Sequence, residues 1–170
     1  MRFFSLKSPA SILLPAALVV LFAEPARADL TGFLGLTTTP TSRTNGGFSV
    51  GTGFLIVAFE FEYSATKEDA KSTRLSPALR TFMFNGLLQT PVPIARMQFY
   101  GTLGGGGYRE TLSTQPLNDQ TNFGTNLGGG AKINLVGPLR VRVDYRVFTL
   151  HGNPRHSPVQ RLYAGINLKF

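Results

Sequence analysis

The chain has 170 residues, a formal net charge of +8, no cysteine and only two histidines, His151 and His156. This composition excludes disulfides, thiol chemistry and a cysteine metal site, and it argues against a histidine metal cluster, so no cofactor is expected. The basic residues lie singly along the chain, which argues against nucleic-acid binding, while 19 Gly, 14 Phe and 5 Tyr favour a sheet-rich fold.

A secretory signal peptide is the first element in chain order. Its positively charged start is followed by an apolar run at 12–22 and by the small-x-small sequence Ala26-Arg27-Ala28. The run contains a proline and is shorter than the roughly 20 residues that a membrane-spanning helix needs. We therefore predict that residues 1–28 are removed by cleavage after Ala28 and that 29–170 form one exported domain.

Eight strand-like segments follow, each with apolar and polar residues at alternate positions and with turn-forming residues between them. The alternation is clearest in the third segment, where Phe59 and Phe61 alternate with Glu60 and Glu62. In the first segment the choice of face is ambiguous, because Phe33 and its neighbouring leucines lie on opposite faces. The predicted strands are residues 31–38, 47–54, 57–65, 78–89, 95–109, 122–135, 139–150 and 159–170.

The last segment, 159–170, alternates apolar residues with mostly polar ones and finishes on an aromatic residue. A strand with lipid on one side and a polar lumen on the other accounts for this pattern. Gly165, Leu168 and Phe170, in the arrangement Gly-x-x-Leu-x-Phe, resemble the terminal assembly signal of bacterial outer-membrane β-barrels. The resemblance implies that the barrel-assembly machinery reads this strand and that it closes the barrel against the first strand. An ordinary amphipathic strand is the alternative.

The connections between the segments are predicted to alternate in length, as in outer-membrane barrels with long outer loops and short periplasmic turns. An even count of eight strands then places both ends of the domain in the periplasm. The prolines after the signal peptide fall in connections or at the first residues of a strand, as expected because proline cannot donate to a ladder. Long connections are predicted at 40–46, 66–76, 110–121 and 151–158, and short ones near Leu55, at 90–94 and at 136–138.

If the apolar faces look outward into lipid, the charged side chains share a lumen just wide enough for side chains to fill, and they must pair. We therefore predict a salt-bridge network inside the barrel. A narrow conduit that favours anions is the alternative, and a soluble barrel with the faces reversed shares the same alternation. The predicted lumen residues are Glu60, Glu62, Arg96, Lys132, Arg140, Arg142, Asp144, Arg146 and Lys169.

Two glycine runs, Gly104 to Gly107 and Gly128 to Gly130, lack the Lys-Ser/Thr that follows a phosphate loop. Pairing of their strands through the loop at 110–121 would bring the runs side by side. Glycine there would relieve crowding where a small barrel bends sharply. The alternative is a smooth patch of wall against which an acyl chain or a partner rests.

The last predicted loop contains both histidines and Ser157. Some eight-stranded barrels are lipid A-modifying enzymes with a histidine and a serine placed to attack an ester. His156 and Ser157 are adjacent, so on a strand they would face opposite ways, and no carboxylate stands nearby in the sequence to orient a base. A polar loop is the preferred interpretation. Cations in the outer loops suit the phosphates of an anionic outer leaflet; these are Arg43, Lys67, Lys71, Arg74 and Arg155.

As an architecture, the whole domain resembles the small eight-stranded outer-membrane proteins, similar to the membrane domain of outer membrane protein A and its opacity-type relatives. The resemblance implies an all-β, eight-stranded antiparallel transmembrane up-and-down barrel in the cell outer membrane. The expected partners are outer-membrane lipid, lipopolysaccharide and the barrel-assembly machinery, not nucleic acid. We expect no enzymatic activity and a structural or surface-interaction role in the envelope; a narrow channel or small-hydrophobe carrier is the alternative, and a lipid A esterase ranks third.

Overall fold

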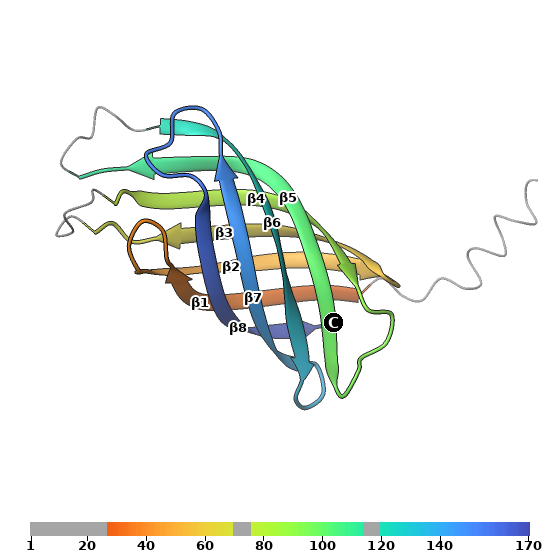
Figure 1. Cartoon of the computed structure of the whole chain (residues 1–170). Coiled ribbons are helices and arrows are strands. Elements are labelled where there is room, and N and C mark those ends of the chain that lie inside the picture. The colour runs from red at the N-terminus through yellow and green to blue at the C-terminus, as the bar shows by residue number, and fades with distance from the viewer. Residues whose placement is uncertain (1–26, 70–75, 114–119) are drawn as a thin grey trace, which may run out of the picture.

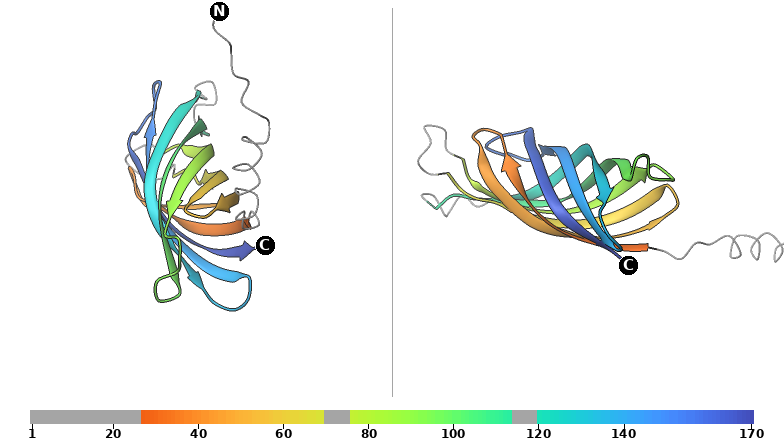
Figure 2. Two further views of the ribbon diagram at one scale, coloured as in Figure 1. Left: turned by 90° about the vertical axis from the view of Figure 1, so that its right-hand side faces the viewer. Right: turned by 90° about the horizontal axis from the view of Figure 1, so that it is seen from below.

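Eight antiparallel strands pair in chain order, and β8 returns to pair with β1, so that the sheet closes into a barrel. The computed structural model describes residues 27–69, 76–113 and 120–170, and Figures 1 and 2 show the closed wall from three sides. The fold class predicted from the sequence is confirmed. The strands are β1 (Arg27–Thr37), β2 (Arg43–Phe54), β3 (Val57–Thr66), β4 (Ala78–Gln89), β5 (Met97–Thr111), β6 (Gln120–Asn134), β7 (Leu139–Leu150) and β8 (Val159–Lys169).

The two ends of the barrel differ in their connections (Figure 1). One end holds the start of β1, Phe170 and the connections 55–56, 90–96 and 135–138; we call it the short-turn end. The opposite end, the long-loop end, holds the other four connections. Gly137 in the last short turn has a φ of 55°, a left-handed conformation that glycine adopts without steric cost. Both ends of the domain therefore lie at the short-turn end, as the even number of strands predicts.

Side chains alternate between the inside and the outside of the wall on every strand. Most outward positions are apolar and exposed, for example Leu34 at 71% and Phe84 at 60%, whereas inward positions such as Asp144 and Arg146 are fully buried. The alternative of a soluble barrel, with apolar side chains inside and charged side chains outside, is therefore excluded. Among the described residues, no helix has the length and apolar character needed to cross a membrane.

The predicted start of β2 and the predicted alternation of connection lengths are wrong. Strand β2 begins at Arg43 rather than Gly47, so the connection from β1 covers only 38–42 and is shorter than the connection at 90–96. The connection lengths therefore do not alternate strictly. The glycines near the start of β2 predict a turn by local propensity, but Gly47 pairs with Phe33 of β1 and Ser64 of β3, and pairing on both edges keeps the segment extended.

Phe33 settles the ambiguous face of β1 by pointing inward, where it is 5% exposed. Its direct partners on the neighbouring strands are both glycines, Gly47 on β2 and Gly165 on β8. A Cβ at either glycine would come within 2.8 Å of the Phe33 side chain. The ring stacks on Tyr163 with centroids 4.3 Å apart, so glycine on both sides makes room for an aromatic residue at the β1–β8 closure.

The two glycine runs lie on the neighbouring strands β5 and β6, as predicted. Their inward members lie against large side chains of the lumen. A Cβ at Gly128 would lie 2.7 Å from Cγ of Arg146, and one at Gly130 would lie 2.6 Å from the hydroxyl oxygen of Tyr100. These glycines therefore relieve crowding where the largest inward side chains pack.

Candidate functional site

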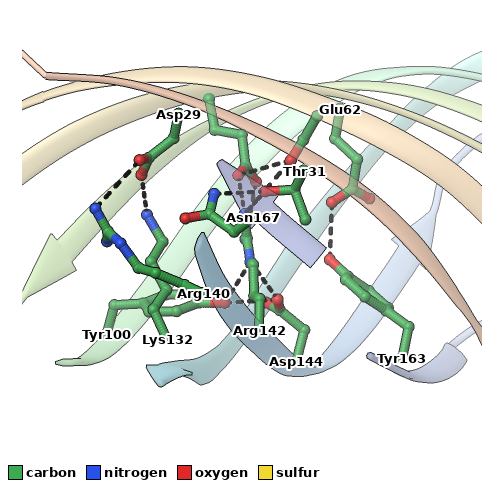
Figure 3. Close-up of polar contacts among 12 residues, drawn as sticks. Asp29, Thr31, Glu62, Tyr100, Lys132, Arg140, Arg142, Asp144, Tyr163 and Asn167 are labelled. Carbon is green, nitrogen blue, oxygen red and sulfur yellow. Dashed lines mark hydrogen bonds and ion pairs between the residues drawn. The ribbon is translucent and has the colours of Figure 1, made fainter. Parts of the chain in front are cut away.

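The middle of the lumen holds five charged side chains from two strands on opposite sides of the barrel. Glu60 and Glu62 are inward residues of β3, while Arg142, Asp144 and Arg146 are inward residues of β7. Alternation places each set on one face of its strand, because side chains two residues apart point the same way. We call this set the central ion-pair layer; Figure 3 shows part of it. All five are at most 4% exposed.

Arg142 joins β7 to β3 across the lumen. Its Nη1 and Nη2 both bond to the Glu60 carboxylate, the Nη2 bond to Oε1 being 3.1 Å long. Its Nε donates to Oδ2 of Asp144 at 2.6 Å and to the hydroxyl of Tyr100 at 2.7 Å. One guanidinium therefore bridges two carboxylates that come from different strands.

Arg146 makes a parallel set of contacts one step nearer the long-loop end. Its Nη2 donates to Oε1 of Glu60 at 2.9 Å, its Nη1 lies 3.0 Å from Oε2 of Glu62, and its Nε donates to Oδ1 of Asp144 at 3.3 Å. Glu60 thus bonds to both arginines. The geometry is that of a network and not of separate pairs.

Two tyrosines complete the layer from β5 and β8. The hydroxyl of Tyr100 donates to Oδ2 of Asp144 at 2.5 Å, and the hydroxyl of Tyr163 donates to Oε2 of Glu62 at 2.8 Å. The guanidinium carbon of Arg142 lies 5.0 Å from the Tyr100 ring centre, a cation–π distance. Four strands are therefore linked through one buried network.

A second charged group lies at the short-turn end. Asp29 of β1 pairs with Lys132 of β6 and with Arg140 of β7, the latter at 3.5 Å. Figure 3 shows both cations directed at this carboxylate. Asp29, Arg140 and half-buried Lys169 line a cavity of about 290 Å³ that opens at this end, together with Gln98 of β5.

The part of the lumen nearer the long-loop end has a different chemistry. Arg161 of β8 is fully buried, and its Nη1 donates to the hydroxyls of Ser64 and Thr81. Its guanidinium carbon lies 4.3 Å from the ring centre of Phe148. Beyond it comes a buried apolar cluster that we call the outer apolar layer; its members are Leu79, Met83, Tyr108, Phe148, Leu150 and Val159.

The structure places eight of the nine predicted lumen residues inside or at the mouth of the barrel; their joint role remains a prediction. Arg96 is a correction. It is exposed in the connection 90–96, has a φ of 68° and donates to the carbonyl oxygen of Leu135. Strand β5 begins at Met97, two residues later than predicted, so its alternation does not extend to Arg96.

The sequence interpretation also missed lumen residues and misplaced one. The predicted lumen set does not include Asp29, which stands next to the predicted cleavage site. It also lacks Arg161, Tyr100 and Tyr163, although their positions alternate in phase with the lumen face. Arg43, predicted as a loop cation, is 6% exposed and donates to the carbonyl oxygens of Pro77 and Thr39. It faces inward because β2 begins there. Lys71 and Arg74 lie outside the described residues.

The residues of the predicted assembly signal occupy both faces of β8. Gly165 faces inward against Phe33, while Leu168 and Phe170 are exposed on the outer face, at 37% and 70%. The backbone N–H of Phe170 donates to the carbonyl oxygen of Ala28 at 2.9 Å, next to the β1–β8 ladder. Recognition of this segment by assembly machinery stays a prediction.

In the loop 151–158, the described contacts of Ser157 and His151 are with backbone, ring and threonine groups. The Ser157 hydroxyl oxygen accepts a hydrogen bond from the backbone N–H of Leu150 at 3.1 Å, so it caps the end of β7. His151 stacks on Phe123 outside the wall, and its Nε2 lies 3.5 Å from the hydroxyl of Thr125. Among the described residues there is no group of three or more potential ligand side chains that could hold a metal ion.

Several solved structures share this architecture. The N-terminal β-barrel domain of Pseudomonas aeruginosa OprF is 14% identical, with a TM-score of 0.65 over 85% of this chain and 97% of that one. Neisserial surface protein A is 14% identical, with a TM-score of 0.66 over 87% and 99%. The outer membrane enzyme PagL is 14% identical, with a TM-score of 0.53 over 82% and 98%. At these identities the likeness shows the fold alone.

Comparison of the sequence with protein families gives a family assignment that the shared fold alone does not give. No curated protein matches this sequence. Residues 16–170, however, match the family described as outer membrane protein beta-barrel domain. The match spans all eight strands, and the structure has the closed barrel and the apolar outer wall that such a domain needs. The chain therefore belongs to the outer membrane protein beta-barrel family, and its place is the outer membrane.

Proposed function

We propose that this protein is a non-enzymatic barrel with a structural or surface-interaction role in the cell envelope, and that its lumen is locked rather than open. The observation that carries the proposal is the central ion-pair layer. Arg142 and Arg146 each bond to carboxylates of β3 and β7, so the network spans the full width of the lumen. A conduit would need these pairs to separate, and separating buried charges is strongly unfavourable.

The packing above the layer supports the same interpretation. Phe148 and Met83 are both 0% exposed in the outer apolar layer, which fills part of the lumen on the long-loop side with uncharged side chains. An ion passing these side chains would lose part of its hydration without gaining a ligand from them. The cavity at the short-turn end opens toward one side of the membrane only, because the ion-pair layer lies above it.

Planar-bilayer recording tests the locked lumen. The wild-type protein, refolded from residues 29–170, is expected to give no defined single-channel steps. A Glu60→Ala, Arg142→Ala double variant removes the centre of the network, and Arg96→Ala is the matched control outside the lumen. Steps that appear only in the double variant would identify the ion-pair layer as the barrier. Regular steps in the wild type would overturn the proposal in favour of the narrow channel.

The absence of catalysis is tested separately, because PagL shares the fold and is an enzyme. The hydroxyl of Ser157 is engaged by the backbone of Leu150, which suits a capping role. We expect lipid A extracted from cells that overexpress the protein to have an unchanged mass profile. A profile that loses an acyl chain with the wild type but not with Ser157→Ala would establish an esterase instead.

We also propose that export and assembly follow the sequence signals. Cleavage after Ala28 would leave Asp29, whose carboxylate pairs with Lys132 and Arg140, as the first residue of the mature protein. The intact mass of protein from outer-membrane fractions checks this site. Gel migration with and without boiling reports the folded barrel, and Phe170→Ala is expected to lower its yield if the assembly machinery reads the last residue.

A further inference from the structure

The outer wall carries only two charged side chains at described outward strand positions. They are Arg80 on β4 and Arg109 on β5, and both are exposed. The register makes them direct cross-strand partners near the long-loop end, so two guanidiniums stand side by side on one face. The two guanidiniums concentrate positive charge at one point of the wall, and one multivalent anion can bond to both.

The level of the pair on the wall points to the membrane interface. One position below it, toward the middle of the wall, the outward residues are Phe82 on β4 and Phe123 on β6, at 49% and 57% exposure. Tyr63 on β3 packs against Phe82 with ring centroids 4.8 Å apart. Aromatic side chains gather at the membrane–water interfaces of outer-membrane barrels. The arginines therefore lie at the height of headgroups, above the acyl region.

An open position lies directly beneath the pair. Gly107 of β5 faces outward, and a Cβ built there would meet no atom within 4 Å. The ring of Phe123 instead leans over Gly105, where a Cβ would lie 2.9 Å from its Cζ. Wall residues thus leave room below Arg109 and beside Phe82, bounded by aromatic surface. A methylene chain fits such surroundings.

We propose that Arg80 and Arg109 form a binding site for the phosphate monoester of an acylated glycolipid in the outer leaflet, with an acyl chain lying over Gly107. A phosphate monoester carries a charge of about −1.5 to −2 near neutral pH, which matches two guanidiniums better than the single charge of a phosphodiester does. Exposed Lys67 follows β3 at the same end and adds a third cation, since Ala65 of β3 pairs with Arg80. The site rests on the proposed envelope role and supplies its lipid partner.

Native mass spectrometry of the refolded barrel in detergent, titrated with bisphosphorylated lipid A, tests the site. Replacing either arginine with alanine is expected to weaken retention about tenfold, because each removes charge-assisted hydrogen bonds. The matched control Arg96→Ala removes the same charge at the short-turn end and should stay within about twofold of wild type. Unchanged retention in an Arg80→Ala, Arg109→Ala double variant would overturn the proposal.

Titrations with other lipids identify which lipid binds to the site. Lipid A lacking both phosphates, and phosphatidylglycerol dissolved in the same detergent, should each bind about tenfold more weakly than bisphosphorylated lipid A. Equal binding of dephosphorylated lipid A would refute the phosphate contact. Equal binding of phosphatidylglycerol would refute the glycolipid as occupant, and so would displacement of lipid A by inorganic phosphate at equal concentration.

Two glycine variants test the acyl contact without changing charge. Gly107→Leu fills the open position and should weaken lipid A retention severalfold. Gly32→Leu is its control, because Gly32 is exposed on β1 and a Cβ there also meets nothing within 4 Å. Equal retention in both would refute the acyl contact. Bilayer recordings on the same samples keep the two proposals apart, since a conducting lumen with intact lipid binding would overturn only the locked barrel.

Discussion

The central ion-pair layer and the outer apolar layer fill the same lumen by different means. The central layer consists of buried charges from β3 and β7 whose partners are fixed by geometry. The outer layer consists of buried apolar side chains around Phe148 that contact one another without directional bonds. Removing one member of an ionic network leaves other charges unpaired, whereas removing one apolar side chain leaves a cavity. Both layers are equally buried, but the apolar layer should tolerate substitution of one side chain better than the ionic layer does.

The largest loss of stability is expected when Arg142 is replaced by alanine. Glu60 and Asp144 would each lose a guanidinium partner inside the barrel, and breaking a buried pair in this way costs about 3–5 kcal/mol. Urea unfolding of the refolded barrel in detergent measures the loss. A change below about 1 kcal/mol would mean that solvent reaches the layer and screens its charges.

A smaller loss is expected in the outer apolar layer. Met83 is 0% exposed, so Met83→Ala leaves a cavity and should cost about 2–4 kcal/mol. The matched variant Met83→Leu keeps the volume and should cost less than about 1.5 kcal/mol. The same unfolding assay applies. If Met83→Leu were as damaging as Met83→Ala, this layer would depend on shape as strictly as the ionic layer depends on its partners.

Removing one hydroxyl from the edge of the ionic layer should have an intermediate effect. Tyr100→Phe keeps the ring but deletes the donor to Asp144 and the acceptor for Arg142, at a cost of about 1–2 kcal/mol. Tyr145→Phe is the control, because Tyr145 is 47% exposed on the outer wall. Equal effects in the two variants would show that the tyrosine hydroxyls act at the membrane and not in the network.

The smallest effect is expected outside both layers. Arg96→Ala removes an exposed arginine from the connection between β4 and β5, and the free energy of unfolding should change by no more than about 0.5 kcal/mol. A loss comparable to that of Arg142→Ala would place Arg96 in the lumen after all. The variants of the three lumen residues, compared with Arg96→Ala, rank these positions by the chemistry of their partners.

Much of the fold could be predicted because successive side chains of a strand point to opposite faces, so apolar and polar residues alternate in the sequence with a period of two. The segments 78–89 and 139–150 match β4 and β7 residue for residue. Predictions failed where long-range pairing overrides local propensity. The glycines before Phe48 suggest a turn, yet they pair on both sides with β1 and β3.

The candidate site could be predicted only as a set of inward residues. Alternation places Glu60 and Arg142 on lumen faces, but it does not say that β3 and β7 stand opposite each other at the same height. That depends on the register of all eight strands. The apolar character of the outer lumen was missed for a related reason, since inward apolar residues such as Phe148 interrupt a polar face that the pattern treats as uniform.

The glycines of β6 have a consequence for how such a wall can change. Gly128 leaves the room that Arg146 occupies, and Gly130 leaves the room that Tyr100 occupies. A bulky residue on one strand therefore requires a missing side chain on its neighbour, and neither can be exchanged alone. Transfer of β7 into another barrel would therefore require transfer of β6 as well. The unit that can be exchanged between barrels is the hairpin and not the single strand.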